Sequence, residues 1–287
     1  MSFSQKMKFI SSKEGPKAEE LLVVEEKDIF ADLMGDKGSS LLLGKYSIQE
    51  VFAVLRKRNF FKDAQNRGLW PLEFDLDSSE YPLQRFRIFY REKKTENLIV
   101  DLKIKEAIFR LEKRLADEIS VPQFKFLVLD WLTLQNPLLE FSGDLLPLPG
   151  QNHPGLKLGK KVLDLFAYMA RLDKLDGILA FPAYFHNALL FSRQFSFLNP
   201  LKQGEVLAIR KTFRSIPFRQ LAWIVHLECL KEKSLGVYSW KAEEQVHPLN
   251  KILKDYFDSR AYRKKVKQSQ HKSDFSIDWE CFHKKYG

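Results

Sequence analysis

The feature that most restricts the fold is a strand, a loop, a helix and a second strand in succession between residues 124 and 181. The segment 124–134, FKFLVLDWLTL, is largely aromatic and aliphatic, as expected of a buried strand. From residue 158 the apolar residues recur on one face of a helix that covers 158–172. The segment 177–181, GILAF, is again typical of a strand. Two apolar strands joined through an amphipathic helix predict neighbouring parallel strands with a crossover connection.

Local patterns predict further helices and strands on both sides of this unit. Ser47 followed by Glu50 is a capping-box pattern, and the apolar residues after it predict a helix over 48–59. Upstream we also expect a strand at 39–44, a short helix ending near Gly68, a hairpin of 84–90 with 97–104, and a helix at 106–118. Downstream we expect a helix at 183–194, a strand at 195–198, and helices at 216–231 and 250–268. This order predicts an α/β protein of the mixed α+β kind, in which helices flank a central mixed sheet.

The predicted elements divide the chain into three parts. Residues 1–37 are mixed polar and charged and contain the breaker Gly15-Pro16, so we expect a flexible lead-in. Residues 38–200 contain the predicted sheet and form the main domain. Residues 201–287 are expected to be a mainly helical C-terminal extension.

Composition excludes several classes of protein. A hydrophobic content of 45% and an aromatic content of 13% predict a packed core rather than a disordered chain. No apolar run reaches the roughly eighteen residues of a transmembrane helix, and the first residues lack the apolar core of a signal peptide. Cys229 and Cys281 form no metal-spaced cluster and the histidines are scattered, so no metal is expected. We therefore expect a cytoplasmic protein.

The chain is basic, with a formal net charge of +10. The segment 251–287 contains ten Lys or Arg against five Asp or Glu, which is +5 of this excess. A basic protein is suited to nucleic acid, to anionic lipid or to a polyphosphate ligand. The alternative is a solvated surface with a charged tail.

The loop before the 158–172 helix has the features of a phosphate site. Helix N-termini present unpaired N–H groups and a partial positive charge, and glycine lets a phosphate approach the backbone. Gly155 and Gly159 bracket the helix start, and Lys157, Lys160 and Lys161 add positive charge. The pattern predicts a pyrophosphate site. The alternative is a plain loop whose glycines only let the chain turn into the helix.

The order of elements and two local motifs resemble the GNAT-type N-acyltransferase superfamily. In that family a loop between a central strand and a helix binds acyl-CoA, and a strand and a short helix follow. The family loop reads Gln/Arg-x-x-Gly-x-Gly/Ala, and here Gly159 stands at its last glycine, Lys157 at the middle glycine and Pro154 at the Gln/Arg position. A second motif, roughly Asn-x-x-Ala-x-x-x-Tyr-x-x-x-Gly-Phe, is matched by FHNALLFSRQFSF at Ala188 and Phe197.

The resemblance implies transfer of an acyl group, such as acetyl, from acyl-CoA to a small-molecule or peptide amine. It implies equally a degenerate relative that only binds acyl-CoA. Residues 38–200 would then be an acyl-CoA-binding domain, with the pyrophosphate over Gly155, Leu156, Lys157, Leu158, Gly159 and Lys160. Three positions depart from the second motif: Phe185 replaces the Asn, Ser192 the Tyr and Ser196 the Gly. The family's Tyr commonly protonates the departing CoA thiolate, and a serine is a much poorer acid. The family loop follows its strand directly, so the segment LLEFSGDLLPLPG is either an insertion or contains the true strand end.

Several residues are candidates for the chemistry of transfer. His153, in Gln-Asn-His-Pro-Gly, is a candidate general base with an ordinary pKa near neutrality, or else a turn residue. The resemblance implies that His186 and Asn187, which follow Tyr184, lie near the reaction centre. Tyr184, His186 and Tyr168 are the candidates to replace Ser192 as the acid. Asn187 is expected beside the cofactor. A capping or core role for His186 and Asn187 is the alternative.

A second class of function is a basic nucleic-acid-binding or interaction module without catalysis. It would use the basic segment YRKKVKQ of the 250–268 helix. The alternative for this helix is a cap on the core. Neither the acceptor amine nor the oligomeric state can be read from the sequence.

Overall fold

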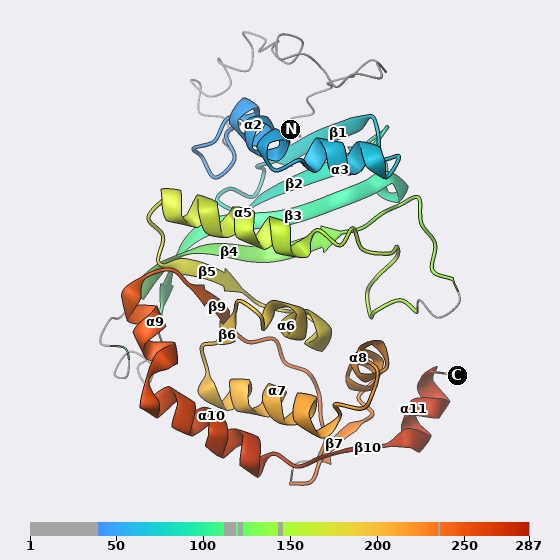
Figure 1. The fold of residues 1–287 in the computed structure, drawn as a ribbon, viewed down its shortest axis with the longest axis vertical. Coiled ribbons are helices and arrows are strands. Elements are labelled where there is room, and N and C mark those ends of the chain that lie inside the picture. The colour runs from blue at the N-terminus through green and yellow to red at the C-terminus, as the bar shows by residue number, and fades with distance from the viewer. Residues whose placement is uncertain (1–39, 112–118, 120–122, 143–145, 235, 287) are drawn as a thin grey trace. The chain divides into compact units, whose positions relative to one another are not determined.

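The computed structural model describes residues 40–111, 119, 123–142, 146–234 and 236–286 (Figure 1). The predicted lead-in at 1–37 lies outside the described residues. So do residues 112–118 of the helix predicted at 106–118.

Seven strands form one sheet in the order β1-β2-β3-β4-β5-β9-β6. They are β1 (Leu72–Asp77), β2 (Gln84–Tyr90), β3 (Leu98–Arg110), β4 (Gln123–Leu134), β5 (Gly177–Ala180), β6 (Ser196–Phe197) and β9 (Gln245–Pro248). The pairs β1–β2, β2–β3, β5–β9 and β6–β9 are antiparallel, and the sheet also contains parallel pairing. The predicted mixed α/β fold is therefore confirmed.

The crossover predicted between two apolar strands is present. Helix α5 (Gly159–Leu172) connects β4 to β5, which are neighbours in the sheet. Asp176, just before β5, donates its backbone N–H to the Lys125 carbonyl at 2.8 Å, and its carboxylate accepts from the Lys125 N–H at 2.7 Å. Because Lys125 lies near the start of β4, the two strands begin at the same edge and run in one direction, as their arrows show in Figure 1.

The chain divides into two compact units. The first holds the described residues of Met1–Glu106, Val128–Glu140 and His153–Leu165. The second holds those of Ala107–Leu127, Phe141–Asn152 and Phe166–Gly287. This division is interleaved along the chain and differs from the predicted boundary at residue 200.

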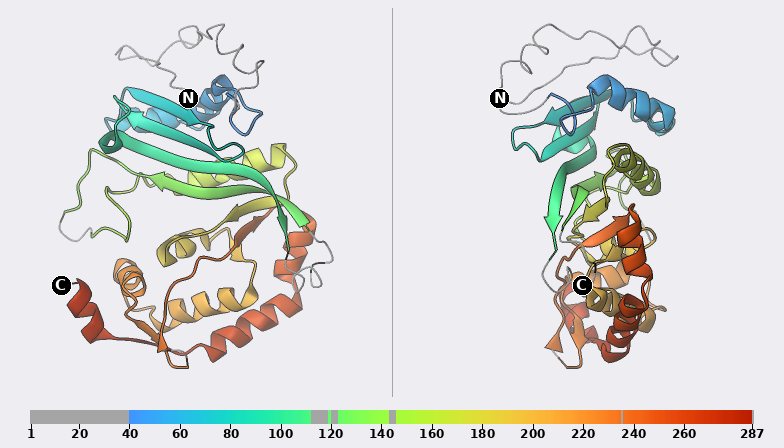
Figure 2. Two further views of the ribbon diagram at one scale, coloured as in Figure 1. Left: turned by 180° about the vertical axis from the view of Figure 1, so that it is seen from behind. Right: turned by 90° about the vertical axis from the view of Figure 1, so that its left-hand side faces the viewer.

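In the first unit, α2 (Ile48–Lys57) and α3 (Phe60–Asn66) pack on one face of β1–β3 (Figure 2). The packing is aromatic: the ring of Phe74 on β1 lies 4.5 Å from that of Phe52 and 6.2 Å from that of Phe61, between centroids. The capping box predicted at Ser47 and Glu50 is present at the start of α2. A short 3₁₀ helix (Thr95–Asn97) lies in the link between β2 and β3.

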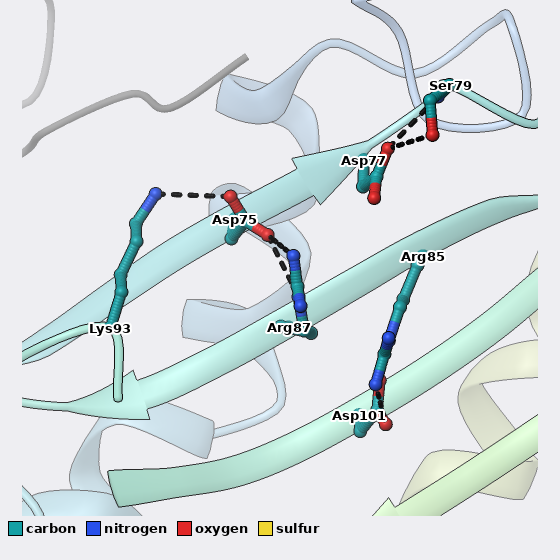
Figure 3. A network of polar contacts seen from close by, with 7 residues as sticks. All are labelled: Asp75, Asp77, Ser79, Arg85, Arg87, Lys93 and Asp101. Atoms are coloured by element: carbon teal, nitrogen blue, oxygen red, sulfur yellow. Dashed lines mark hydrogen bonds and ion pairs between the residues drawn. The ribbon is translucent and has the colours of Figure 1, made fainter. Parts of the chain in front are cut away.

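The opposite face of these strands carries paired charges (Figure 3). Arg85 on β2 donates two hydrogen bonds of 2.7 and 2.8 Å to Asp101 on β3. Arg87 is bonded to Asp75, which stands opposite it on β1, and Lys93 approaches the same carboxylate at 3.3 Å. Both carboxylates are only 5% exposed. Each buried charge therefore has an ionic partner, as the cost of desolvating it requires.

The second unit combines the β5–β9–β6 part of the sheet with a smaller sheet and several helices. Its helices are α6 (Phe185–Phe191), α7 (Pro200–Thr212), α8 (Phe218–His226), α9 (Lys251–Asp258), α10 (Arg260–Lys272) and α11 (Trp279–Tyr286). The smaller sheet has the order β10-β7-β8 and contains β7 (Leu230–Glu232), β8 (Gly236–Val237) and β10 (Phe275–Ile277). Helices α7 and α10 lie side by side (Figures 1 and 2), and only glycine fits at 204, since a Cβ there would lie 2.5 Å from the Val266 carbonyl.

Two upstream predictions are wrong. The apolar run at 39–44 was expected to be a strand, but Leu43 and Gly44 have φ of 57° and 67°, and the segment turns back to form a single bridge between Leu42 and Tyr46. The predicted helix at 106–118 is wrong over 106–110, where β3 continues. Strand β1 was not predicted, although Leu72, Phe74 and Leu76 alternate with acidic residues along it.

Downstream, the predicted helices begin close to where expected but differ from the prediction further along. Helix α8 ends at His226, and Glu228 takes a positive φ of 56° before the chain enters β7, so the helix predicted to 231 is too long. The helix predicted at 250–268 is two helices, because Ser259 has extended backbone and caps the second of them. Strand β9 comes from beyond residue 200 and joins the main sheet.

Candidate functional site

The loop predicted to bind pyrophosphate lies along the end of β4 in the first unit. Gln135 and Gly155 form an antiparallel bridge, and the Asn136 N–H donates to the Pro154 carbonyl at 2.8 Å. The Leu156 N–H donates to the Leu134 carbonyl at 3.3 Å. The chain thus leaves β4 at its end and returns to that end at residues 154–156. These contacts favour the interpretation that LLEFSGDLLPLPG is an insertion between the strand and the loop.

The start of α5 has no side-chain cap among the described contacts. The residue before it is Leu158, which has no polar side chain, and the first turn contains no Asp or Glu. By contrast, Ser or Asn side chains cap α2, α7, α9 and α10. Helices α3, α6 and α8 also begin without a side-chain cap bond. The N–H groups of Gly159, Lys160 and Lys161 point out of the helix start without a protein acceptor in the described part of the chain.

Neither glycine of the loop is required by the fold. A Cβ at Gly159 would meet nothing within 4 Å, and one at Gly155 would make only an ordinary contact with the Leu134 carbonyl at 3.5 Å. The residue that adopts the left-handed conformation is Lys157, with φ of 57°. Gly159 therefore leaves open space in front of the unpaired N–H groups.

The surroundings of the loop are mainly cationic. Lys161 pairs with Asp63 on α3 at 2.7 Å. Lys157 and Lys160 are exposed and have no ionic partner among the described residues. Arg67, just after α3, donates to the Leu156 carbonyl at 3.4 Å and to the Asp63 carbonyl at 2.8 Å. Arg67 was not expected here, because no local spacing links it to a loop 89 residues further on.

The predicted catalytic residues are divided between the two units. His153 belongs to the first, where its Nδ1 lies 3.2 Å from the Leu139 carbonyl. This contact ties the histidine to the inserted segment, as expected of the turn residue that was the alternative to a general base. Tyr184, His186 and Asn187 belong to the second unit, at the start of α6.

His186 is buried and uncharged at neutral pH. Its side chain is 3% exposed and its ring stacks on that of Tyr184, with 5.3 Å between the centroids. Burial, with smaller contributions from His226 and Arg219, lowers the pKa of His186 to about 4 from an ordinary 6.5. Asn187 is half-buried and donates its backbone N–H to the Tyr184 carbonyl at 3.1 Å. At pH 7 the imidazole of His186 is neutral, and burial makes it a weaker base than an exposed histidine.

Two segments that are far apart in the sequence, 147–150 and 223–226, lie close to Tyr184. The Tyr184 ring also contacts His226 of α8 at 5.6 Å, and His226 contacts Trp223 at 5.5 Å. The Trp223 indole donates to the Pro147 carbonyl at 2.8 Å. Gly150 has a φ of 77° and lies against the Tyr184 side chain. A Cβ at residue 150 would be only 2.7 Å from the Tyr184 hydroxyl oxygen. No sequence spacing joins the 147–150 and 223–226 segments, so sequence reasoning missed His226 and Trp223.

Ser192, which the resemblance aligned with a tyrosine, makes a local hydrogen bond. Its hydroxyl donates to the Leu189 carbonyl at 2.7 Å, at the end of α6. Satisfying the last carbonyls of a helix is an ordinary role for a serine. If an acid acts on a leaving group, it must come from another residue.

The cationic segment predicted near the C-terminus lies on α10. A depression of about 980 Å³ runs along this helix, and its basic lining residues are Arg260, Arg263, Lys264, Lys267, His271 and Lys272. Asp258, which precedes the helix, pairs with Arg263 at 2.6 Å. The helix itself contains no Asp or Glu.

Comparison of the chain with models of known protein families, with curated proteins and with solved structures found no match. Within the described residues, no helix is both long and apolar enough to cross a membrane. Nor do three or more His, Cys, Asp or Glu side chains in that part of the chain gather where they could hold a metal ion.

Proposed function

We propose that the protein binds acyl-CoA with the pyrophosphate on the start of α5 and transfers the acyl group to an amine. The observation that carries the proposal is the start of α5, where no acceptor for the first N–H groups is found among the described residues. The space around a Cβ at Gly159 is free there, and the cations Lys157 and Lys160 lie close by in the chain. A pyrophosphate accepts hydrogen bonds from such N–H groups, and its negative charge is stabilised by the helix end.

The order of elements supports the same proposal. A loop between a central strand and a helix, followed by a strand and a short helix, is the arrangement that the GNAT-type resemblance implies. Here the order is β4, loop, α5, β5 and α6. The chain returns to the end of β4 at the Gln135–Gly155 bridge, and α5 begins shortly after it. The loop therefore lies beside the end of the strand, which supports the proposal.

The transfer itself needs a base for the amine and an acid for the thiolate. The nitrogen of a neutral amine attacks the thioester carbonyl, the C–S bond breaks, the amine proton passes to a base, and the thiolate takes a proton. His153, which belongs to the same unit as the start of α5, is the proposed base. Tyr184 is the acid that the resemblance implies. His186 is a weaker alternative base, because burial lowers its pKa to about 4. A relative that only binds acyl-CoA would keep the helix start and lack the proton transfers.

The proposal is tested by calorimetry and thermal unfolding of the full chain with CoA and acetyl-CoA. Binding is expected to release or absorb measurable heat and to raise the melting temperature as CoA is added, by mass action. Absence of both responses at millimolar CoA would refute the proposed ligand. Acetyl transfer to a panel of small amines and lysine peptides then separates a transferase from a binding protein.

A second candidate function is binding of nucleic acid through α10. The observation that favours it is the row of cations on this helix without an acidic residue of its own. Binding of an oligonucleotide should weaken steeply with salt and should be reduced by Lys264→Glu and Lys267→Glu. If CoA gives no response while an oligonucleotide does, this candidate replaces the first. The expected cytoplasmic location remains part of either proposal.

A further inference from the structure

The two cysteines of the chain lie together in the second unit. Cys229 and Cys281 are 52 residues apart, yet their Sγ atoms are 2.6 Å from each other. Non-bonded heavy atoms ordinarily pack at about 3.5–4 Å, whereas a disulfide bond measures about 2.05 Å. Both residues are free thiols in the structure. Their separation is therefore close to that of a bonded pair.

Backbone contacts hold the two residues in place independently of the sulfur atoms. The Asp278 N–H donates to the Cys229 carbonyl at 2.9 Å, and the Cys281 N–H donates to the Asp278 carboxylate at 2.9 Å. Next to them, β10 pairs with β7, with Ile277 opposite Leu230. Formation of an S–S bond thus requires little movement of the backbone.

The cysteines differ in access to solvent. Cys229 is 0% exposed, and burial raises the pKa of its thiol to about 11. Cys281, on α11, is partly exposed. A soluble oxidant therefore reaches Cys281 first, and Cys229 is placed behind it to complete the bond.

We propose that Cys229 and Cys281 form a reversible disulfide by exchange with a low-molecular-weight disulfide such as oxidised glutathione. The Cys281 thiolate attacks one sulfur of that molecule, forms a mixed disulfide and releases one small thiol. The Cys229 thiolate then attacks the Cys281 Sγ and releases the second small thiol. In total the two cysteine thiols lose two protons and two electrons, and one small disulfide is reduced to two thiols.

The bond would tether α11 to the core of the second unit. In the thiol form this helix is held by buried Phe282, by a 2.7 Å hydrogen bond from Lys285 to the Leu227 carbonyl, and by the Tyr286–Trp223 ring contact. The bond would also close a loop that includes β9, α9 and α10. Closing a loop of this length restricts the unfolded chain, so oxidation is expected to stabilise the protein.

The test compares full-length protein equilibrated with oxidised glutathione and with dithiothreitol. Each sample is unfolded in N-ethylmaleimide and its intact mass is measured. The oxidised protein is expected to have lost two hydrogen atoms and to carry no maleimide, whereas the reduced protein carries two. Oxidation should raise the melting temperature by about 5–10 °C. Dithiothreitol should reverse both changes.

The matched variant is Cys281→Ser, at the partly exposed position. It is expected to form no internal bond and to show no oxidation-dependent rise in melting temperature. Two alkylated thiols after oxidation, a stable glutathione adduct, or a disulfide-linked dimer of the parent would each overturn the proposal. These outcomes are measured on the parent protein alone, so a poorly folding variant does not weaken the test.

Discussion

Helices α2 and α5 begin in opposite ways within the same unit. At the start of α2, the Ser47 hydroxyl accepts from the Glu50 N–H at 3.3 Å, and the Glu50 carboxylate accepts from the Ser47 N–H at 2.8 Å. At the start of α5 the preceding residue is Leu158, and the first turn carries lysines and no acid. One helix satisfies free N–H groups with its own side chains, whereas no acceptor for those of the other is found in the part of the chain that the structure describes.

The proposal assigns a different use to each of these two helix starts. The hydrogen bonds from Ser47 keep the pKa of Glu50 below its usual value, so a negative charge already occupies the positive end of α2. The first turn of α5 has no acidic residue of its own, although Asp63 of α3 pairs with Lys161 there, and a Cβ at Gly159 would meet nothing within 4 Å. A capped helix start is a structural solution, whereas an uncapped, cationic and open one suits an anionic ligand.

The largest effect is expected from closing the open space at α5. Gly159→Val should reduce CoA binding at least about a hundredfold, because the β-branched side chain covers the N–H groups that hold the phosphates. The variant should fold, since no neighbour lies within 4 Å of the new Cβ. Calorimetry with CoA measures the loss, and Gly159→Ala is the matched control with a smaller effect. A folded valine variant that binds CoA as tightly as the parent contradicts the assignment.

The start of α6 differs from those of α2 and α5 because its first turn buries a histidine, His186. The pKa of His186, about 4, lies below its ordinary 6.5, so the unfolded chain takes up a proton between these values and the folded protein does not. The stability that depends on neutral His186 is therefore complete above pH 6.5 and is lost as the pH falls towards 4. The full loss is roughly 3 kcal/mol.

Urea unfolding of the parent and of His186→Leu at a series of pH values measures this loss. The leucine variant should show a shallower decline in the free energy of unfolding across that window. Equal declines in both proteins would mean that His186 is not held neutral by burial. Proteins that differ only at residue 186 share all other titrating groups, which cancel in the comparison.

Reversing the charge of Lys160 should weaken CoA binding less than filling the space beside Gly159 does. Lys160→Glu places at this helix start the kind of charge that Glu50 gives to α2, and should weaken CoA binding about tenfold, or roughly 1.4 kcal/mol. Lys160→Gln, which only removes the charge, should cost about twofold to threefold. Both variants should unfold at nearly the parent temperature because Lys160 is exposed. Equal CoA affinities of Lys160→Gln and Lys160→Glu would mean that charge at the helix start does not affect CoA binding.

Removing the cap of α2 should affect stability and leave the ligand unaffected. Ser47→Ala should lower the free energy of unfolding by about 1 kcal/mol, because the Glu50 N–H loses its acceptor. Denaturant unfolding measures this change, and the CoA affinity of the folded variant should equal that of the parent. A loss of CoA affinity in Ser47→Ala would erase the distinction between the two helix starts.

The smallest effect is expected from an exposed lysine of the loop. Lys157→Ala should weaken CoA binding by about 1 kcal/mol or less, and the difference should shrink as salt is added. Lys94→Ala, at a lysine paired with Glu92 in the β2–β3 link, is the control and should not alter binding. A salt-independent loss in Lys157→Ala would indicate that its left-handed backbone, rather than its charge, supports the loop.

The sequence was sufficient to predict the elements with strong local signals. The capping box at Ser47, the apolar strand at 124–134 and the helical period from 158 each appear within a few residues, and the structure confirms all three. The errors occurred where a distant partner decides the conformation. Asp75 in β1 is buried beside its ionic partner Arg87, and a lone sequence shows neither the burial nor the partner.

The candidate site could be predicted only in part for the same reason. Gly159 and the lysines were found because a helix start has a local signature. Arg67, His226 and Trp223 were missed because their contacts join segments separated by up to 89 residues. Whether Tyr184 and His186 carry out proton transfer stays a prediction, since their contacts fit a packed aromatic cluster as well.

The most direct test of the central claim compares the two helix starts by NMR. Gly159 and Ile48 are the first residues of α5 and α2, so samples labelled with ¹⁵N-glycine and ¹⁵N-isoleucine report matched amides. The two resonances are identified by their absence in Gly159→Ala and Ile48→Val. On addition of CoA the Gly159 amide resonance should shift progressively to saturation, while that of Ile48 stays in place. An unmoved Gly159 resonance at millimolar CoA, or equal movement of both, would contradict the account.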